Sequence, residues 1–187
     1  MNQLTLYKFQ SVEDIETKYQ FKFSSVKYDN NIHDAIISIF NNDYTGEIID
    51  GILLHVKALY YEKVDLDSVL MKEYYLMAIE LKHVSSMFNL GSYYKKIEKD
   101  YDLMKIYYLM AIELKHAKAM FNLGAYYKKV EKDYDLMKKY YLMAIELKHV
   151  GSMSSLGSYY EKVEKDYDLM KTYYLMAIEL KHVYAMS

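Results

Sequence analysis

Four histidines recur at a fixed spacing of 33 residues, and they are the first side chains in this sequence that could do chemistry. They are His83, His116, His149 and His182. Imidazole nitrogens bind zinc at about 2 Å, whereas packed helices lie about 8 to 10 Å apart. Equivalent positions of successive repeats are therefore too far apart to share one ion. We predict no metal site and expect each histidine in the turn that follows a helix.

The other candidate groups form no catalytic constellation. Four glutamates recur at the same spacing and are expected to face solvent or a neighbouring lysine: Glu80, Glu113, Glu146 and Glu179. His33 and His55 have no partner at a recognisable spacing. The absence of cysteine excludes disulfides, thiolate metal sites and cysteine nucleophiles, and no phosphate-binding loop or nucleophile elbow occurs. We predict that the protein is not an enzyme and uses no cofactor.

Charge and hydropathy limit the partners. The formal net charge of -2 provides no general attraction for nucleic acid, which is therefore not the expected ligand. The chain has no apolar stretch long enough to cross a membrane and does not begin with a basic segment followed by an apolar one. We expect a soluble, cytoplasmic protein.

The histidines belong to a larger repeat. The ten residues from Tyr107 to His116 occur again from Tyr74, Tyr140 and Tyr173. Close copies span residues 84–116, 117–149 and 150–182, a degenerate copy spans 47–83, and residues 183–187 match the opening of another. Such a period is typical of a solenoid, in which each repeat packs mainly on its neighbours.

Two amphipathic helices are predicted in each copy. In the middle copy helix A covers residues 118–130, with these residues on its buried face: Met120, Leu123, Tyr127 and Val130. Gly124 would allow a close approach of the next helix. Asp133 is expected to cap helix B, because its carboxylate can accept the free amides of the first turn. The buried stripe of helix B is predicted to contain Leu136, Met137, Tyr140, Tyr141, Ala144 and Leu147.

Residues 1–46 lack the repeat. Ser11 and Asp14 predict the start of a short helix that ends near Tyr19, while Tyr19, Phe21 and Phe23 alternate as in a strand. A second helix is expected over residues 32–40. We interpret the segment as a cap on the array, with a separate functional domain as the alternative.

The repeat resembles the Sel1-like branch of the tetratricopeptide superfamily. The resemblance is carried by Leu123-Gly124, Tyr127, Asp133, Tyr140-Tyr141, Ala144 and His149, and by the same positions in the copies on either side. It implies an all-α, right-handed α-solenoid over residues 47–187. The loop between the helices is about three residues shorter than in that family, Ile145 replaces an alanine and Lys148 replaces a glycine. The composition, rich in Tyr, Lys, Ile and Asp, is also similar to that of repeat proteins encoded by giant viruses of amoebae, including one of a mimivirus virophage-resistance element. That resemblance implies a host-cytoplasm location and a nuclease or helicase as partner.

By the same resemblance, the A helices line a concave groove that binds a segment of another protein. The predicted contact residues are Phe88, Ser92, Lys95, Lys96, Lys118, Phe121, Lys128 and Lys129. Phe88 and Phe121 are expected to be exposed anchors for a peptide, because Ser154 at the third equivalent position suggests that the fold does not need an aromatic ring there. The alternatives are a structural or self-associating module and weak binding of nucleic acid by the lysines.

The last helix B would keep the apolar residues that earlier copies bury against the next repeat. We therefore expect a homodimer through the C-terminal end, with Tyr174, Met176 and Tyr184 in the contact. The alternative is that residues 183–187 fold back and cover this face within one chain.

Overall fold

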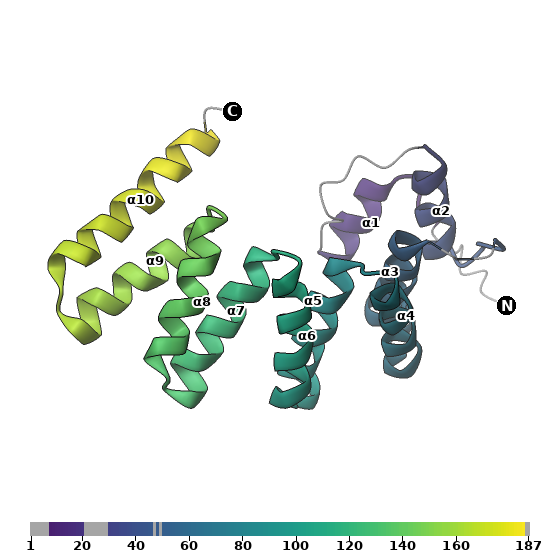
Figure 1. Cartoon of the computed structure of the whole chain (residues 1–187). Coiled ribbons are helices and arrows are strands. Elements are labelled where there is room, and N and C mark those ends of the chain that lie inside the picture. Colours follow the sequence, from purple (N-terminus) through teal and green to yellow (C-terminus); the bar gives the residue numbers. More distant parts are fainter. Residues whose placement is uncertain (1–7, 21–29, 47, 49, 186–187) are drawn as a thin grey trace, which may run out of the picture. The chain divides into compact units, whose positions relative to one another are not determined.

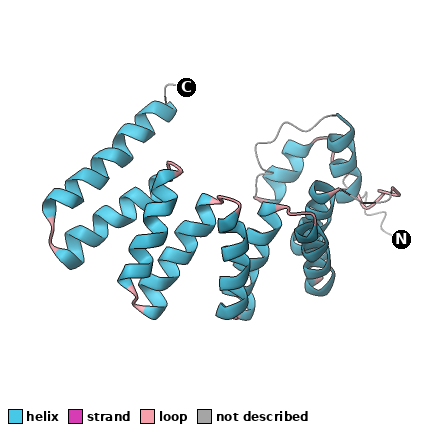
Figure 2. Cartoon of the chain, in the orientation of Figure 1, coloured by secondary structure: helices cyan, strands magenta, loops and turns pink. Residues whose placement is uncertain are grey.

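The structure is a computed structural model that describes residues 8–20, 30–46, 48 and 50–185. Side chains of residue 30 and of residues 182–185 are not described, and the predicted alternation at Phe21 and Phe23 lies outside the described residues. In the described ranges every regular element is helical, as Figure 2 shows. The prediction of an all-α fold built from repeated helix-turn-helix units is confirmed. The right-handed sense of the solenoid stays a prediction.

The chain forms two compact units, residues 1–90 and 91–187, which are described separately here (Figure 1). The first unit contains α1 (Val12–Tyr19), α2 (Asn30–Phe40), α3 (Gly51–Tyr60) and α4 (Ser68–Glu80). Helix α5 (Val84–Tyr93) continues from the first unit into the second. Helices α1 to α4 pack in chain order, each on the next.

The N-terminal helices pack onto the first repeat within unit 1. Ser11 caps α1 as predicted, because its Oγ accepts from the amide of Asp14 at 3.1 Å. The side-chain amide of Asn41 bonds both the N–H and the C=O of Phe9, at 2.7 and 3.0 Å. The ring of Phe40 meets Tyr60 of α3 edge to face at 5.9 Å. Within unit 1, α2 thus packs on α3, and the interpretation of the N-terminal segment as a cap stays a prediction. The predicted helix of residues 47–61 begins at Gly51, since Asp50 caps it.

Unit 2 consists of repeated helix pairs. Its elements are α6 (Tyr101–Glu113), α7 (Ala117–Tyr126), α8 (Tyr134–Glu146), α9 (Val150–Tyr159) and α10 (Tyr167–Ala185). The A helix α7 pairs with the B helix α8, and α9 pairs with α10, while α7 and α9 also pack on α6 and α8. Helix α10 continues to Ala185, so residues 183–185 extend helix B and do not begin a new helix A. At the junction after α8, Lys148 adopts a left-handed conformation and α9 packs back on α8. The described residues beyond Lys181 include no helix that packs back in this way.

Each A helix ends in a π-helical turn that the sequence did not predict. These turns are η1 (Tyr61–Asp65), η2 (Tyr94–Glu98), η3 (Tyr127–Glu131) and η4 (Tyr160–Glu164). In η3 the ring of Tyr127 stacks on Tyr140 of helix B at 5.6 Å, and Lys132 closes the turn with a φ of 60°. The wider turn rotates Val130 out of the predicted buried face, and it is 51% exposed. The prediction that Val130 is buried is therefore wrong.

The caps and the close helix contact agree with the sequence. Asp133 Oδ1 accepts from the amide of Leu136 at 2.9 Å. A Cβ added to the buried Gly124 would lie 2.8 Å from the ring of Tyr141 and 3.2 Å from the carbonyl of Met137. Helix α8 therefore approaches α7 closely at this glycine. Leu147, in contrast, is 38% exposed because α8 ends at Glu146 and the chain turns away there, so its predicted burial is wrong.

Candidate protein-interaction surface

Tyrosine hydroxyls of the B helices form hydrogen bonds with side chains of the A helices and their π-helical turns. In unit 2 the hydroxyl of Tyr108 lies 3.1 Å from Ser92 Oγ and accepts from Asn122 Nδ2 at 3.3 Å. The hydroxyl of Tyr174 donates to Glu161 at 3.1 Å. Unit 1 contains the equivalent bond, from Tyr75 to Glu62 at 2.6 Å. Ser92, a predicted partner contact, is therefore already held by Tyr108.

Phe121 is a packing residue and not the protruding anchor that the sequence suggested. Its half-buried ring stacks on Tyr141 at 5.6 Å and lies 5.0 Å from the ring of His149. His55, at the equivalent position of the degenerate copy, makes the same two contacts with Tyr75 and His83. Phe88, also equivalent, is half-buried in unit 1. The histidine at position 55 was the available signal that this site packs between a tyrosine and a histidine.

The predicted contact lysines lie on and beside the π-helical turns. Lys95 and Lys128 are half-buried, while the other three are exposed: Lys96, Lys118 and Lys129. Burial lowers the pKa of Lys95, and the charges of Lys129 and Lys96 lower it further. The pKa of Lys128 is lowered by burial and then by Lys162 and Lys129. These charge effects link four of the predicted contact lysines and Lys162 into one group, which we call the lysine cluster: Lys95, Lys96, Lys128, Lys129 and Lys162.

Lys118 stands apart from the lysine cluster. It is exposed on the first turn of α7, and its charge contributes to lowering the pKa of His116 and of His149, after the effect of burial. It thus lies within electrostatic range of two successive junctions. Of the predicted contacts in unit 2, four lysines lie in the lysine cluster, and Ser92, Lys118 and Phe121 do not.

Two of the repeated histidines, His116 and His149, cap helices, which corrects their predicted role, and the backbone of His182 lies within α10 and not in a turn after it. His116 Nδ1 accepts from the amide of Ala119 at 3.2 Å, and His149 Nδ1 accepts from Ser152 at 3.1 Å. Each imidazole thus begins the following helix A as well as ending the turn after helix B. An accepting nitrogen requires a neutral ring, and burial lowers the pKa of both histidines. Among the described residues no group of three or more His, Asp or Glu side chains is placed to hold a metal.

One buried polar cluster in unit 1 was missed by sequence reasoning. The hydroxyl of Ser86 lies 2.9 Å from His55 Nδ1 and 3.0 Å from His83 Nδ1. Because one hydroxyl has a single proton, two neutral imidazoles are satisfied when one nitrogen accepts and the other donates. Burial followed by the charge of His83 lowers the pKa of His55 to about 3. Ser86 has no exposed surface, so the cluster is suited to packing and not to attack on a substrate.

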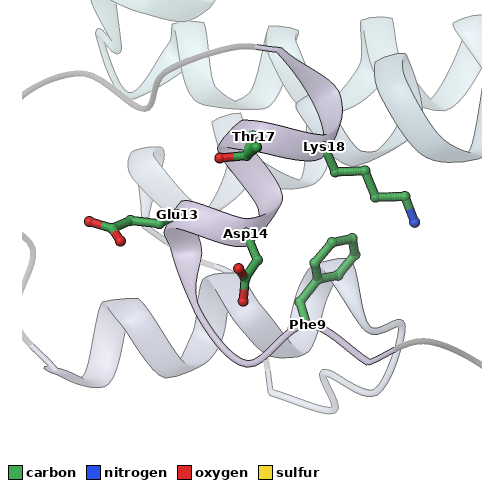
Figure 3. Close-up of a pocket in the computed structure, with 5 residues that line it drawn as sticks. All are labelled: Phe9, Glu13, Asp14, Thr17 and Lys18. Atoms are coloured by element: carbon green, nitrogen blue, oxygen red, sulfur yellow. The ribbon is translucent and has the colours of Figure 1, made fainter.

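An open pocket of about 520 Å³ lies beside α1 in unit 1 (Figure 3). Its lining residues are Phe9, Glu13, Asp14, Thr17 and Lys18, none of which was a predicted site residue. The ammonium of Lys18 lies 5.0 Å from the centre of the Phe9 ring. This cation-π contact occupies the two groups best able to hold an anion or an apolar ligand.

The predicted self-association residues lie on α10. Met176 is 37% exposed, and Tyr174 is half-buried with its hydroxyl bonded to Glu161. The backbone of Tyr184 belongs to α10, and its side chain lies outside the described residues.

Paired helices with a tyrosine-rich core and a polar A-helix side define a helical-repeat protein. The structure is similar to the crystal structure of a Sel1 repeat protein from Oxalobacter formigenes, with a TM-score of 0.65 and 19% sequence identity over 80% of this chain and 66% of that one. This likeness supports the Sel1-like repeat fold. The chain spans slightly less than two thirds of the length of that protein.

Two immunity proteins from Pseudomonas aeruginosa also align, with TM-scores of 0.49 and 0.35 and identities of 18% and 20%. The aligned regions cover 70% and 75% of this chain, and 68% and 69% of the respective immunity proteins. Comparison with models of protein families found no match, and neither did comparison with curated proteins. The resemblance to viral repeat proteins stays a prediction. In the part of the chain that the structure describes, no helix has the length and hydropathy needed to cross a membrane.

Proposed function

We propose that this protein is a non-enzymatic scaffold that binds a segment of another protein on the side formed by the A helices and their π-helical turns. The observation that carries the proposal is where the repeats differ. The copies 117–149 and 150–182 differ at eight positions, and only one of these, Lys139 against Thr172, lies on helix B. Six lie on α7 and one on η3. Ala119 and Ser152 are fully buried and Phe121 packs on Tyr141, whereas the other variable positions keep exposed area.

The variable positions define the surface to be tested. They include Lys118 against Gly151, Asn122 against Ser155, Ala125 against Ser158 and Lys128 against Glu161. All of these side chains keep exposed area, whereas the central Leu123 and Leu156 are fully buried. Exposed side chains on a rigid scaffold recognise partners, which fits a core that changes little beneath a surface that changes more.

Peptide display against the purified full chain, followed by hydrogen-exchange mapping of the selected peptide, tests the proposal. The expected result is protection of α7, α9 and the turns η2 to η4. A variant that carries the third copy's residues in the second, Lys118→Gly with Asn122→Ser and Ala125→Ser, should lose the peptide without losing the helical CD signal. The matched change on helix B, Lys139→Thr, should keep it. Protection on α6 and α8 alone, or a failure to select any peptide, would refute the proposal.

Self-association through α10 is a second candidate, and a specific difference in burial favours it. Ile178 is 51% exposed, whereas Ile112 at the equivalent position of α6 is 8% exposed. Exposed apolar area of this kind favours association. Under this candidate the chain forms a homodimer, and Met176→Glu or Tyr174→Glu dissociates it in light scattering coupled to size exclusion. A strict monomer at micromolar concentration would refute it. A nuclease or helicase as partner stays a prediction from the viral resemblance.

A further inference from the structure

Two members of the lysine cluster, Lys95 and Lys128, occupy a repeat position from which glutamates in other copies reach the tyrosine hydroxyls. Positions 62, 95, 128 and 161 are equivalent and hold Glu, Lys, Lys and Glu. Where the residue is glutamate, its carboxylate reaches the buried tyrosine of helix B, as Glu161 reaches Tyr174 at 3.1 Å. Lys95 and Lys128 therefore begin at the position from which a glutamate reaches the tyrosine of helix B in the other copies. Their half-buried state agrees with this placement.

Two other lysines of unit 2 are neutralised by carboxylates. Lys105 lies 3.2 Å from Asp102 and 3.3 Å from Glu131. Lys138 lies 3.6 Å from Asp135 and 3.1 Å from Glu164. Among the ion pairs of the described residues, none includes a member of the lysine cluster. Glu131 of η3 and Glu164 of η4 thus pair with lysines of the preceding helix B and not with the lysine cluster.

Crowded cations without counter-ions raise the free energy of the unbound surface. Lys95 and Lys128 are each lowered in pKa by burial and by two neighbouring lysines, as described above. An incoming anion would relieve this repulsion and form charge-assisted hydrogen bonds with ammonium groups that have already lost part of their water. The surface is therefore better prepared for an anionic ligand than for a neutral one.

We propose that the lysine cluster binds an acidic segment of a partner protein. This rests on the proposed function and names the chemistry of the partner. A protein segment fits better than a nucleic acid, because the same turns and the helix starts after them carry carboxylates that would repel a continuous phosphate chain. These are Glu98, Asp100, Glu131, Asp133 and Glu161. Separate carboxylates on a peptide can address the lysines and avoid these groups.

The test uses a fluorescein-labelled glutamate-rich peptide, its counterpart with glutamine at every glutamate, and a single-stranded oligonucleotide. Anisotropy with the full chain should show binding of the glutamate peptide, little binding of the other two, and weaker binding as salt is raised. Lys95→Glu and Lys128→Glu should each weaken binding roughly tenfold, the order expected when an attraction between part-exposed charges becomes a repulsion. Both variants should fold, because Glu62 and Glu161 already occupy the equivalent positions and bond the tyrosine.

Lys139→Glu is the matched control, since it makes the same change in net charge on helix B, where Lys139 is exposed. It should leave binding unchanged. Equal weakening by Lys139→Glu would show an effect of net charge alone and overturn the inference, as would tighter binding of the oligonucleotide or no binding of the glutamate peptide. A display-selected peptide that protects the A helices but lacks acidic residues would overturn this inference and leave the proposed function standing.

Discussion

The half-buried pair His55 and His83 makes a sharp prediction about acid. The two rings lie 4.6 Å apart and share the hydroxyl of Ser86. The folded-state pKa of His55 is about 3, against an ordinary value of 6.5. Between these values the unfolded chain binds more protons than the folded one, so stability is present above pH 6.5 and is lost as pH falls.

The size of the effect follows from the shift. Lowering the pH from about 7.5 to about 5 should cost roughly 2 kcal/mol through His55 if its ring were fully enclosed. Its side chain keeps some exposure, so about 1 to 2 kcal/mol is expected. The other groups facing the pair are Asp50, which raises the pKa of His83, and Tyr75, whose ring lies 5.6 Å from His55 and whose hydroxyl is bonded to Glu62. For both histidines, burial is the largest cause of the lowered pKa.

Equivalent positions of the repeats suggest the variants for the assay, because His55 and Phe121 correspond to each other. His55→Phe reproduces in unit 1 the arrangement of Phe121, His149 and Ser152 in unit 2, so it should fold. Urea unfolding followed by far-UV CD should show that this variant loses about 1 to 2 kcal/mol less than the parent on acidification. The reciprocal change Phe121→His should add a similar loss. An identical loss in the parent and in His55→Phe would refute the reasoning.

Three predictions concern stability and can be measured by the same unfolding assay. Gly124→Ala should cost about 1 to 3 kcal/mol, because its Cβ would lie 2.8 Å from Tyr141. Gly151→Ala is the control and should be tolerated, because other copies carry Ser or Lys at this position. Equal costs would contradict the packing described. Met137→Ala should cost about 2 to 5 kcal/mol from the fully buried core, whereas Leu147→Gln should change stability by under about 0.5 kcal/mol, and a large loss at Leu147 would restore its predicted burial. Asp133→Ala should cost about 0.5 to 2 kcal/mol through the lost cap on α8, and an unchanged midpoint would show that water replaces the carboxylate.

The repeat, the helix pairs and their local chemistry could be predicted from the residues and their spacing. The 33-residue period predicted the helical repeats, Asp133 predicted the cap of α8, and Gly124 predicted the close contact with it. These features depend on residues near one another in the chain or on a strict periodicity, so they can be read without knowing the neighbours. The all-helical fold followed from them.

The exposure of individual side chains depends on the tertiary structure and could not be predicted from the sequence. The sequence predicts an exposed ring at Phe121, yet this half-buried ring packs on Tyr141 and His149. Val130 fits an apolar helical stripe, but the π-helical turn changes the register and exposes it. The charge of Lys129 affects the pKa of Lys95 in the preceding copy, and such an effect depends on how the repeats stack. Periodicity fixes the face of a helix on which a residue lies, whereas burial and charge depend on what the neighbouring repeat places against that face.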